Sequence, residues 1–168
     1  PMRILIVGTN FKPTHGGIAE LTHQVARHLT RLGAQIHVLT GLSTGPTLHD
    51  PNGEYVLHRI DCVSGWKATR FLRRLCRVLT HLRQIRPDIV LISEYDYLAF
   101  TTALATLLIG RPYSIYLHGL DVARPLPRLA EIKRSFALGH AAQAFCNSGF
   151  TRTVALRKGA RIDRTKVI

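Results

Sequence analysis

The sequence has few cysteines, few acidic residues and no long run of apolar residues. Its three cysteines, Cys62, Cys76 and Cys146, are widely spaced, so they offer neither a disulfide framework nor a set of zinc ligands. No apolar run approaches the roughly 20 residues that span a bilayer. No secretory leader precedes the first apolar run either. We therefore expect a cytoplasmic protein without a metal site.

The shortage of acidic residues leaves a strongly basic chain. Asp and Glu number 10 against 23 Lys and Arg, which gives a formal net charge of +13. Such an excess is typical of proteins that meet nucleic acid, anionic lipid or phosphorylated ligands, although a basic surface without a function would look the same. The length of 168 residues and the apolar content of 46% suit one domain with a substantial core.

Short apolar runs alternate with amphipathic segments along the whole chain. Runs rich in β-branched residues predict buried strands, and apolar residues at helical spacing predict helices. The alternation predicts an α/β fold with one Rossmann-like, doubly wound and mainly parallel sheet of about seven strands flanked by helices. We expect the third strand near an edge and the fourth at the centre. The predicted strands are 3–7, 35–40, 55–60, 88–93, 113–117, 142–146 and 165–168; the predicted helices are 17–32, 67–86, 98–109, one from Pro127 that stops at Leu138 before Gly139, and 149–158, with a loop at 41–53.

The first strand leads through a loop into the glycine pair Gly16 and Gly17, where the first helix begins. Glycines there let the backbone approach a ligand, and the unpaired N–H groups of a helix N-terminus favour an anion such as phosphate. A simple flexible turn would have the same sequence. The loop does not match the G-x-G-x-x-G fingerprint, and Thr40 and Gly41 stand where an acid for a ribose hydroxyl is expected, so a nicotinamide cofactor is disfavoured.

Polar residues follow three further strands, at the edge where ligands bind in this architecture. His118 comes directly after one strand and three residues before Asp121. Its imidazole is suited to contact a phosphate or a sugar hydroxyl or to polarise a developing charge, and a purely structural histidine remains the alternative. We expect Glu94 and Asp96 to point to opposite faces and therefore not to act as one acid–base pair. Hydrogen bonds to a hydroxyl-rich substrate, or a cap on the next helix, suit them better.

The helix at 67–86 combines an apolar stripe with many arginines. Its basic face has three interpretations: a solvated surface, a contact with anionic membrane headgroups through Arg70, Arg73, Arg74 and Arg77, or a contact with nucleic acid. The amphipathic pattern alone does not decide between them.

Several segments, in this order and spacing, resemble the N-terminal domain of retaining GT-B glycosyltransferases of glycosyltransferase family 4. They cover essentially the whole chain. The end of the fourth strand departs from the pattern, because Ser93-Glu94-Tyr95 stands where many relatives place histidines, and this leaves the type of acceptor open. The segments are Gly16-Gly17-Ile18-Ala19-Glu20, residues 31–40, Arg86-Pro87-Asp88-Ile89-Val90, His118-Gly119-Leu120-Asp121, and Asn147-Ser148 with Thr151-Arg152.

The resemblance implies that residues 1–168 form the N-terminal, acceptor-side domain and that a C-terminal donor-binding domain lies outside this chain. It implies transfer of a sugar, with retention, from a nucleotide-sugar to a hydroxyl acceptor, without metal or cofactor and without activity in the isolated fragment. Its partners would be the donor, the acceptor, the protein's own C-terminal domain and, at the inner membrane face, anionic lipid; no nucleic acid is expected.

The resemblance also assigns roles to individual residues. His118 and Asp121 would be catalytic, and Gly16 and Gly17 would approach the donor diphosphate. The candidates for acceptor binding are Asn10, His15, Glu94, Tyr95, Ser148, Thr151 and Arg152. The alternative from the residues alone is a basic α/β module that binds nucleic acid or phosphorylated ligands without catalysis.

Overall fold

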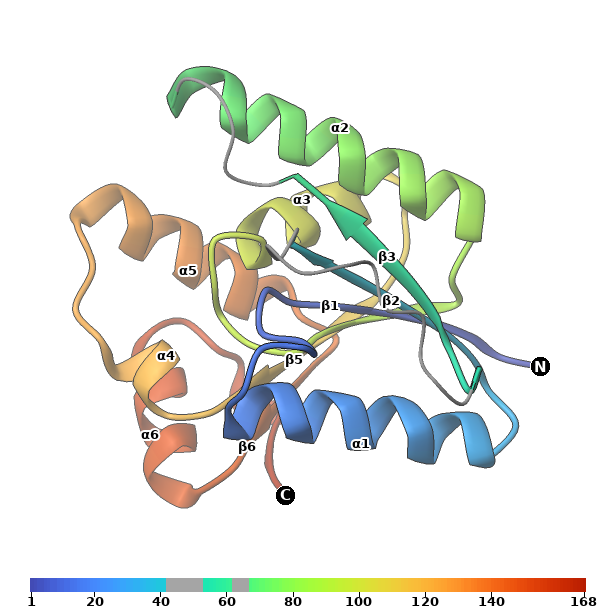
Figure 1. The fold of residues 1–168 in the computed structure, drawn as a ribbon. Coiled ribbons are helices and arrows are strands. Elements are labelled where there is room, and N and C mark those ends of the chain that lie inside the picture. Colours follow the sequence, from blue (N-terminus) through green and yellow to red (C-terminus); the bar gives the residue numbers. More distant parts are fainter. Residues whose placement is uncertain (42–52, 62–66) are drawn as a thin grey trace.

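The computed structural model describes residues 1–41, 53–61 and 67–168, and the fold is an α/β sandwich around one parallel sheet (Figure 1). Within these residues the sheet has seven strands in the order β3-β2-β1-β4-β5-β6-β7, and every neighbouring pair is parallel. The predicted doubly wound sheet is therefore confirmed. The third strand lies at an edge and the fourth near the centre, as expected. The strands are Arg3–Val7 (β1), Gln35–Gly41 (β2), Val56–Ile60 (β3), Ile89–Ile92 (β4), Tyr113–Leu117 (β5), Gln143–Cys146 (β6) and Thr165–Val167 (β7).

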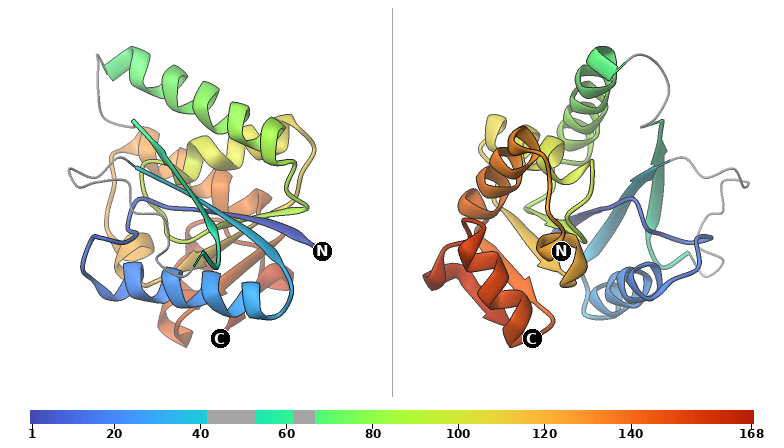
Figure 2. Two further views of the ribbon diagram at one scale, coloured as in Figure 1. Left: turned by 45° about the vertical axis from the view of Figure 1, so that its right-hand side comes forward. Right: turned by 90° about the vertical axis from the view of Figure 1, so that its left-hand side faces the viewer.

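Helices cover the sheet on both faces (Figure 2). Those of the described residues are Gly17–Arg31 (α1), Lys67–Ile85 (α2), Ala99–Leu108 (α3), Leu120–Ala123 (α4), Arg128–His140 (α5) and Gly149–Arg157 (α6), with a 3₁₀ turn at Ile162–Arg164. The loop predicted at 41–53 falls mostly on residues 42–52, which, like residues 62–66, lie outside the described part.

The alternation of side chains along β1 divides the core in two. Ile4 and Ile6 pack under α1 with Ala26. Leu5 and Val7 face the other side and belong to the larger cluster with α2, α3 and α5. A strand that buries both faces in this way reads as a continuous apolar run, which is the pattern that predicted it.

The apolar stripe of α2 is buried in the C-terminal part of the helix, as its spacing predicted, whereas Leu72 near the start is 61% exposed. Val78, Leu82 and Ile85 are all less than 10% exposed and belong to the larger core cluster. Full burial of each such side chain stabilises the fold by about 1.5–3 kcal/mol relative to exposure. The helix is therefore held by packing on α3 and the sheet, and its arginines lie on the remaining faces.

One predicted helix end is wrong. Gly139 does not stop α5, which continues to His140. A Cβ at Gly139 would stand 3.3 Å from the carbonyl oxygen of Gly159, so this glycine allows the close approach of the turn after α6. The short helix α4 was also not predicted, because a single turn has too few residues to show a periodicity.

Candidate functional site

The order of strands reverses between β1 and β4, and ligands of such sheets bind beside this point, at the carboxyl ends of the strands. The segments that leave these ends are residues 8–16 after β1, 93–98 after β4, 118–121 after β5 and 147–148 after β6. Side chains of all four segments are joined by hydrogen bonds, so the structure brings together the groups that the sequence placed at separate strand ends.

Glu94 holds the loop that follows β1. Its Oε1 accepts a hydrogen bond from Asn10 N at 2.9 Å, and its Oε2 accepts from Asn10 Nδ2 at 2.6 Å. Glu94 is 5% exposed. Two of the candidate acceptor residues therefore bond to one another, and the carboxylate positions the loop.

Asp96 makes a second link to the same loop. Its Oδ2 accepts from Thr9 N at 2.8 Å, and its Oδ1 accepts from Leu98 N and Ala99 N at 2.7 and 2.9 Å, which caps the start of α3. Burial, and then the nearby charge of Glu94, raise the pKa of Asp96 to about 6. The expectation that Glu94 and Asp96 point apart is wrong, because both carboxylates accept hydrogen bonds from the loop after β1, at Asn10 N and Thr9 N. The predicted helix cap is confirmed.

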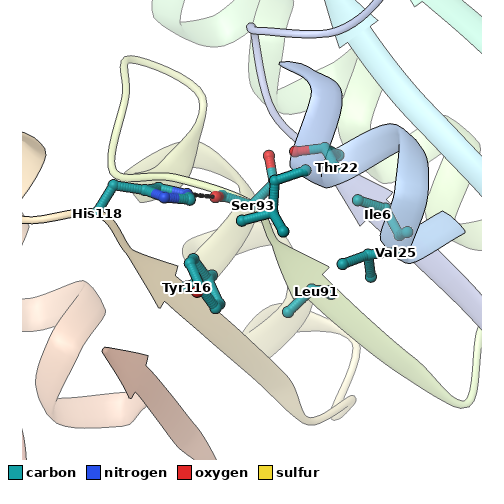
Figure 3. Close-up of a pocket in the computed structure, with 8 residues that line it drawn as sticks. Ile6, Thr22, Val25, Leu91, Ser93, Tyr116 and His118 are labelled. Atoms are coloured by element: carbon teal, nitrogen blue, oxygen red, sulfur yellow. Dashed lines mark hydrogen bonds between the residues drawn. The ribbon is translucent and has the colours of Figure 1, made fainter. Parts of the chain in front are cut away.

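His118 lies half-buried at the end of β5, with its ring centroid 4.5 Å from that of Tyr116. Its Nε2 is 2.8 Å from the carbonyl oxygen of Ser93 (Figure 3). A carbonyl only accepts, so Nε2 carries the hydrogen and donates it. This bond fixes the ring and leaves Nδ1 as the nitrogen for a ligand.

Asp121 acts on backbone rather than on the imidazole. Its Oδ1 accepts from His118 N at 3.0 Å, and its Oδ2 accepts from Tyr95 N at 3.1 Å. One carboxylate thus ties the end of β5 to the end of β4. Asp121 therefore stabilises the turn that follows β5.

A small pocket lies between α1 and the sheet beside His118 (Figure 3). Its volume is about 30 Å³, and its lining includes Thr22, Val25, Ser93, Tyr116 and His118. A space of this size holds roughly one or two water molecules, so it is not a substrate site by itself.

The glycine pair opens α1 as predicted. Gly16 is the N-cap at φ 154° and ψ 158°. Among the described residues, no atom lies within 4 Å of the place where a Cβ would stand on Gly16 or Gly17. Glu20, in the first turn, pairs with Lys12 at 2.7 Å. His15 is exposed on the loop just before the pair. The helix N-terminus therefore faces open space.

The residues after β6 are mostly engaged in the fold. Ser148 caps α6 by accepting from Thr151 N at 3.1 Å. Thr151 is only 1% exposed. Arg152 donates from Nε to the carbonyl oxygen of Thr165 at 3.2 Å, which ties α6 to β7. These contacts account for Ser148, Thr151 and Arg152 without an acceptor.

Sequence reasoning assigned no role in the site to Ser93, Asn147 or Gly8. Asn147 Nδ2 donates to the carbonyl oxygen of His118 at 3.2 Å, and its Oδ1 accepts from Thr151 Oγ1 at 2.7 Å. A Cβ on Gly8 would stand 2.0 Å from Ser93 Oγ. A glycine directly after a buried strand was the one available signal of this close approach between the ends of β1 and β4.

The four arginines considered for a membrane have different surroundings. Arg73 Nη1 lies 3.9 Å from Asp61 Oδ2. Arg74 places its guanidinium carbon 4.5 Å from the centre of the Tyr97 ring. Arg70 and Arg74 line a groove beside α3 and α5, and Arg77 is exposed. They do not form one uniform surface.

The described part of the chain has neither a cluster of metal-ligating side chains nor a helix suited to cross a membrane. No group of three or more His, Cys, Asp or Glu side chains there is arranged to hold a metal ion. No helix there has the length and apolar character needed to cross a membrane.

Solved structures with the same fold include proteins described with UDP or named for a UDP-sugar. One is HepE from Anabaena in complex with UDP and glucose, with 21% identity, a TM-score of 0.72, and 100% of this chain aligned to 44% of that one. Another is UDP-GlcNAc 2-epimerase from Methanocaldococcus jannaschii, with 16% identity, a TM-score of 0.70, and 99% aligned to 45%. MurG from Acinetobacter baumannii has 17% identity, a TM-score of 0.66, and 99% aligned to 45%.

The chain therefore spans less than half the length of these structures. At such identities they show the fold alone, which is one half of a GT-B fold. A comparison with curated proteins found no match. The model of the glycosyl transferase 4-like domain matches residues 16–168, and the chain belongs to this family.

Proposed function

We propose that this domain is the acceptor-side half of an enzyme that transfers a sugar from a nucleotide-sugar to a hydroxyl acceptor with retention. The observation that carries the proposal is the network at the switch point, in which Ser93 engages His118 Nε2 and leaves Nδ1 available to a ligand. Anabaena HepE, which has the same fold, is described in complex with UDP-glucose, and this supports a UDP-sugar as donor.

The chemistry assigned to the site is electrostatic. The open N-terminus of α1 at Gly16 and Gly17 offers backbone N–H groups and the positive end of the helix dipole to the donor diphosphate. His118 Nδ1 forms a hydrogen bond with the transferred sugar. This bond stabilises the charge that develops on the sugar as its bond to the leaving diphosphate breaks. The leaving group carries its own charge on phosphate oxygens, so the proposal includes no metal.

Other residues position these groups. Glu94 and Asp96 hold the loop after β1, and Asp121 holds the turn that carries His118. A pre-organised donor costs no reorganisation in the transition state, which is why fixed backbone and ring positions favour catalysis. Because the chain spans less than half of the similar structures, we assign the rest of the donor site to a second domain and expect no transfer by residues 1–168 alone.

The test is a transfer assay on the protein together with its donor-binding half, using a panel of nucleotide-sugars with a mixture of hydroxyl acceptors. We expect His118→Ala to lower kcat by about 100-fold or more, as for other single groups that stabilise a transition-state charge. The control is His140→Ala, an exposed histidine at the end of α5, which should leave kcat unchanged.

Three further readouts sharpen the test. The product's anomeric configuration, read by NMR, should match that of the donor, and a chelator should leave the rate unchanged. Equal rates for His118→Ala and the unaltered protein would contradict the proposed role of His118. Conversion of a UDP-sugar without any acceptor would show epimerisation instead of transfer.

A basic binding module without catalysis is the second candidate, and the net charge of +13 favours it. It predicts binding of a polyanion that does not respond to nucleotide-sugars. Absence of transfer for every donor, together with such binding, would select this candidate.

A further inference from the structure

A groove of about 430 Å³ lies between the start of α2, the segment after β4 and the start of α5. Figure 1 shows α2, α3 and α5 side by side on this face of the sheet. The volume falls in the range of small-molecule sites, which is about 300–1,000 Å³. The groove is thus large enough for a sugar with one charged substituent.

Positive charge gathers in this groove. Arg70 and Arg74 come from α2, Arg124 from the end of α4, and Lys133 from α5. Among the described residues, no carboxylate oxygen lies within 4.0 Å of the charged nitrogens of Arg70, Arg124 or Lys133. The groove therefore carries cations whose charge the fold does not neutralise.

The one carboxylate in the lining does not offset them. Asp96 uses Oδ1 and Oδ2 to accept from three backbone N–H groups, those of Thr9, Leu98 and Ala99. Its lone pairs are directed at the backbone and not at the groove. The lining therefore holds four cations against one carboxylate, and this excess of positive charge favours an anion.

Aromatic rings hold the cations in place. Lys133 Nζ lies 5.6 Å from the centre of the Phe71 ring and 5.4 Å from that of Phe100, and these two rings stack with centroids 6.0 Å apart. Arg74 lies over Tyr97 at 4.5 Å. Contact with two ring faces removes water from one side of the Lys133 ammonium group, which lines the groove and can donate to a ligand there.

We infer that this groove binds a phosphate group of the acceptor, with the aromatic rings packing against the sugar or lipid carbon atoms next to that phosphate. The inference rests on the proposed function and adds the chemical class of the acceptor to it. Guanidinium and ammonium groups recognise phosphate by charge-assisted hydrogen bonds. The groove adjoins the transfer site, because Tyr95 and Asp96 line it and Tyr95 N is bonded to Asp121.

The test is a binding measurement that needs no donor and no turnover. Isothermal titration of the protein with phenyl phosphate should show binding, and neutral phenyl glucoside should bind at least 10-fold more weakly. Arg74→Gln and Lys133→Gln should each weaken phenyl phosphate binding about 10-fold or more. Arg77→Gln, an exposed arginine of the same helix outside the groove lining, is the matched control and should bind as the unaltered protein does.

Arg70→Gln is a second groove variant in case either of the first two fails to fold. Equal affinity for the charged and the neutral probe, or an equal loss in Arg77→Gln, would overturn the inference. Intact phenyl phosphate binding without any sugar transfer would overturn the proposed function and leave the groove assignment standing.

A second binding experiment, with lipid vesicles, identifies whether the phosphate belongs to a lipid or to a soluble molecule. Vesicles of phosphatidylglycerol in phosphatidylcholine are compared with phosphatidylcholine alone. Binding that phenyl phosphate displaces and that Lys133→Gln weakens supports a lipid-linked phosphate, whereas phenyl phosphate binding without vesicle binding supports a soluble one. Vesicle binding that is equal in Lys133→Gln and the unaltered protein, with no phenyl phosphate binding, would replace the groove by a general membrane surface.

Discussion

Arg134 is fully buried at 0% exposure, which is rare for an arginine. Its Nη2 donates to both carboxylate oxygens of Glu131 at 2.6 Å, and its Nη1 donates to the carbonyl oxygen of Arg124 at 2.8 Å. Desolvation tends to raise the pKa of Glu131, but hydrogen bonds from Arg134, Lys158 and Leu126 N hold it at about 2. The pair therefore fixes α5 against the turn that carries Asp121.

Removal of the charge of Glu131 tests this pair. We expect Glu131→Gln to lower the free energy of unfolding, measured in urea, by about 3 kcal/mol, because it leaves a buried cation without its carboxylate. The double variant Glu131→Gln with Arg134→Met should be more stable than Glu131→Gln, since it removes the unpaired charge as well.

The control for this prediction is Asp163→Asn. Asp163 forms an exposed ion pair with Arg161, with side chains 57% and 52% exposed, so its loss should leave stability unchanged within error. A double variant that is less stable than Glu131→Gln would show that the arginine contributes through packing rather than through its charge.

At the scale of elements, β2, β3 and α2 meet in a cluster of three histidines. His37 Nδ1 lies 3.0 Å from His58 Nε2, and the His58 and His81 rings are in contact with centroids 5.3 Å apart. Burial and then the charge of Arg3 lower the pKa of His37. Burial, and then His81 and His37, lower that of His58. The folded state therefore favours the neutral imidazoles.

This cluster predicts a loss of stability in mild acid. Well above pH 6.5 both histidines are neutral in the folded and the unfolded chain, so they add no pH dependence there. As the pH falls below 6.5, the unfolded chain binds protons that the folded chain does not, and stability decreases with a slope of at most about 1.4 kcal/mol per pH unit for each histidine. Urea unfolding between pH 7.5 and 5 measures this slope.

His58→Gln should make the slope shallower, because it removes one of the two groups. Asp96 acts in the opposite direction: its pKa is raised to about 6, so the folded state gains stability from it as the pH falls through that value. The free energies of unfolding of His58→Gln and the unaltered protein are therefore compared at each pH. The same comparison is repeated with Asp96→Asn present in both proteins. An identical slope in His58→Gln would contradict the assignment to the histidines.

The elements also show what a sequence can predict about this fold. Strands such as β1 and β4 were predicted because a strand buried on both faces leaves a continuous apolar run. The end of α5 was not, because Gly139 serves a contact with Gly159 that lies 20 residues away along the chain. The spacing of apolar residues predicts which face of an element is buried. It does not predict where two elements approach each other closely.

For the candidate site, the positions at the strand ends were predictable from the sequence, but the hydrogen-bond partners were not. The topology rule alone places His118, Glu94 and the Gly16–Gly17 pair at one edge of the sheet. The partners Ser93 and Asn147 were not predictable, because their hydrogen bonds join strand ends that are 25 or more residues apart. The mutual arrangement of polar groups is a property of the packed sheet and not of any segment.

At the scale of the whole molecule, the net charge of +13 determines how strongly the protein is attracted to polyanions. Outside the groove, which holds four cations, its charge is dispersed: the described salt bridges engage cations on α1, at the end of α6 and in the segment before β7. Dispersed charge gives attraction to any phosphate backbone without selecting a base sequence. Non-specific protein–DNA affinities are about 10⁻⁴–10⁻⁶ M at physiological salt.

We therefore expect only weak binding to a random DNA duplex, in that micromolar or weaker range at 0.15 M NaCl, with an affinity that falls steeply as salt rises because bound counterions are released. His118→Ala should not change it, whereas Lys133→Gln should lower the salt slope by about one phosphate contact at most. Fluorescence anisotropy of a labelled duplex at several salt concentrations measures both quantities, with a second duplex of different sequence as the control. A submicromolar affinity at 0.15 M NaCl, or a preference for one duplex, would contradict this expectation and favour the binding module, because dispersed charge supplies neither the affinity nor the base contacts that such selectivity needs.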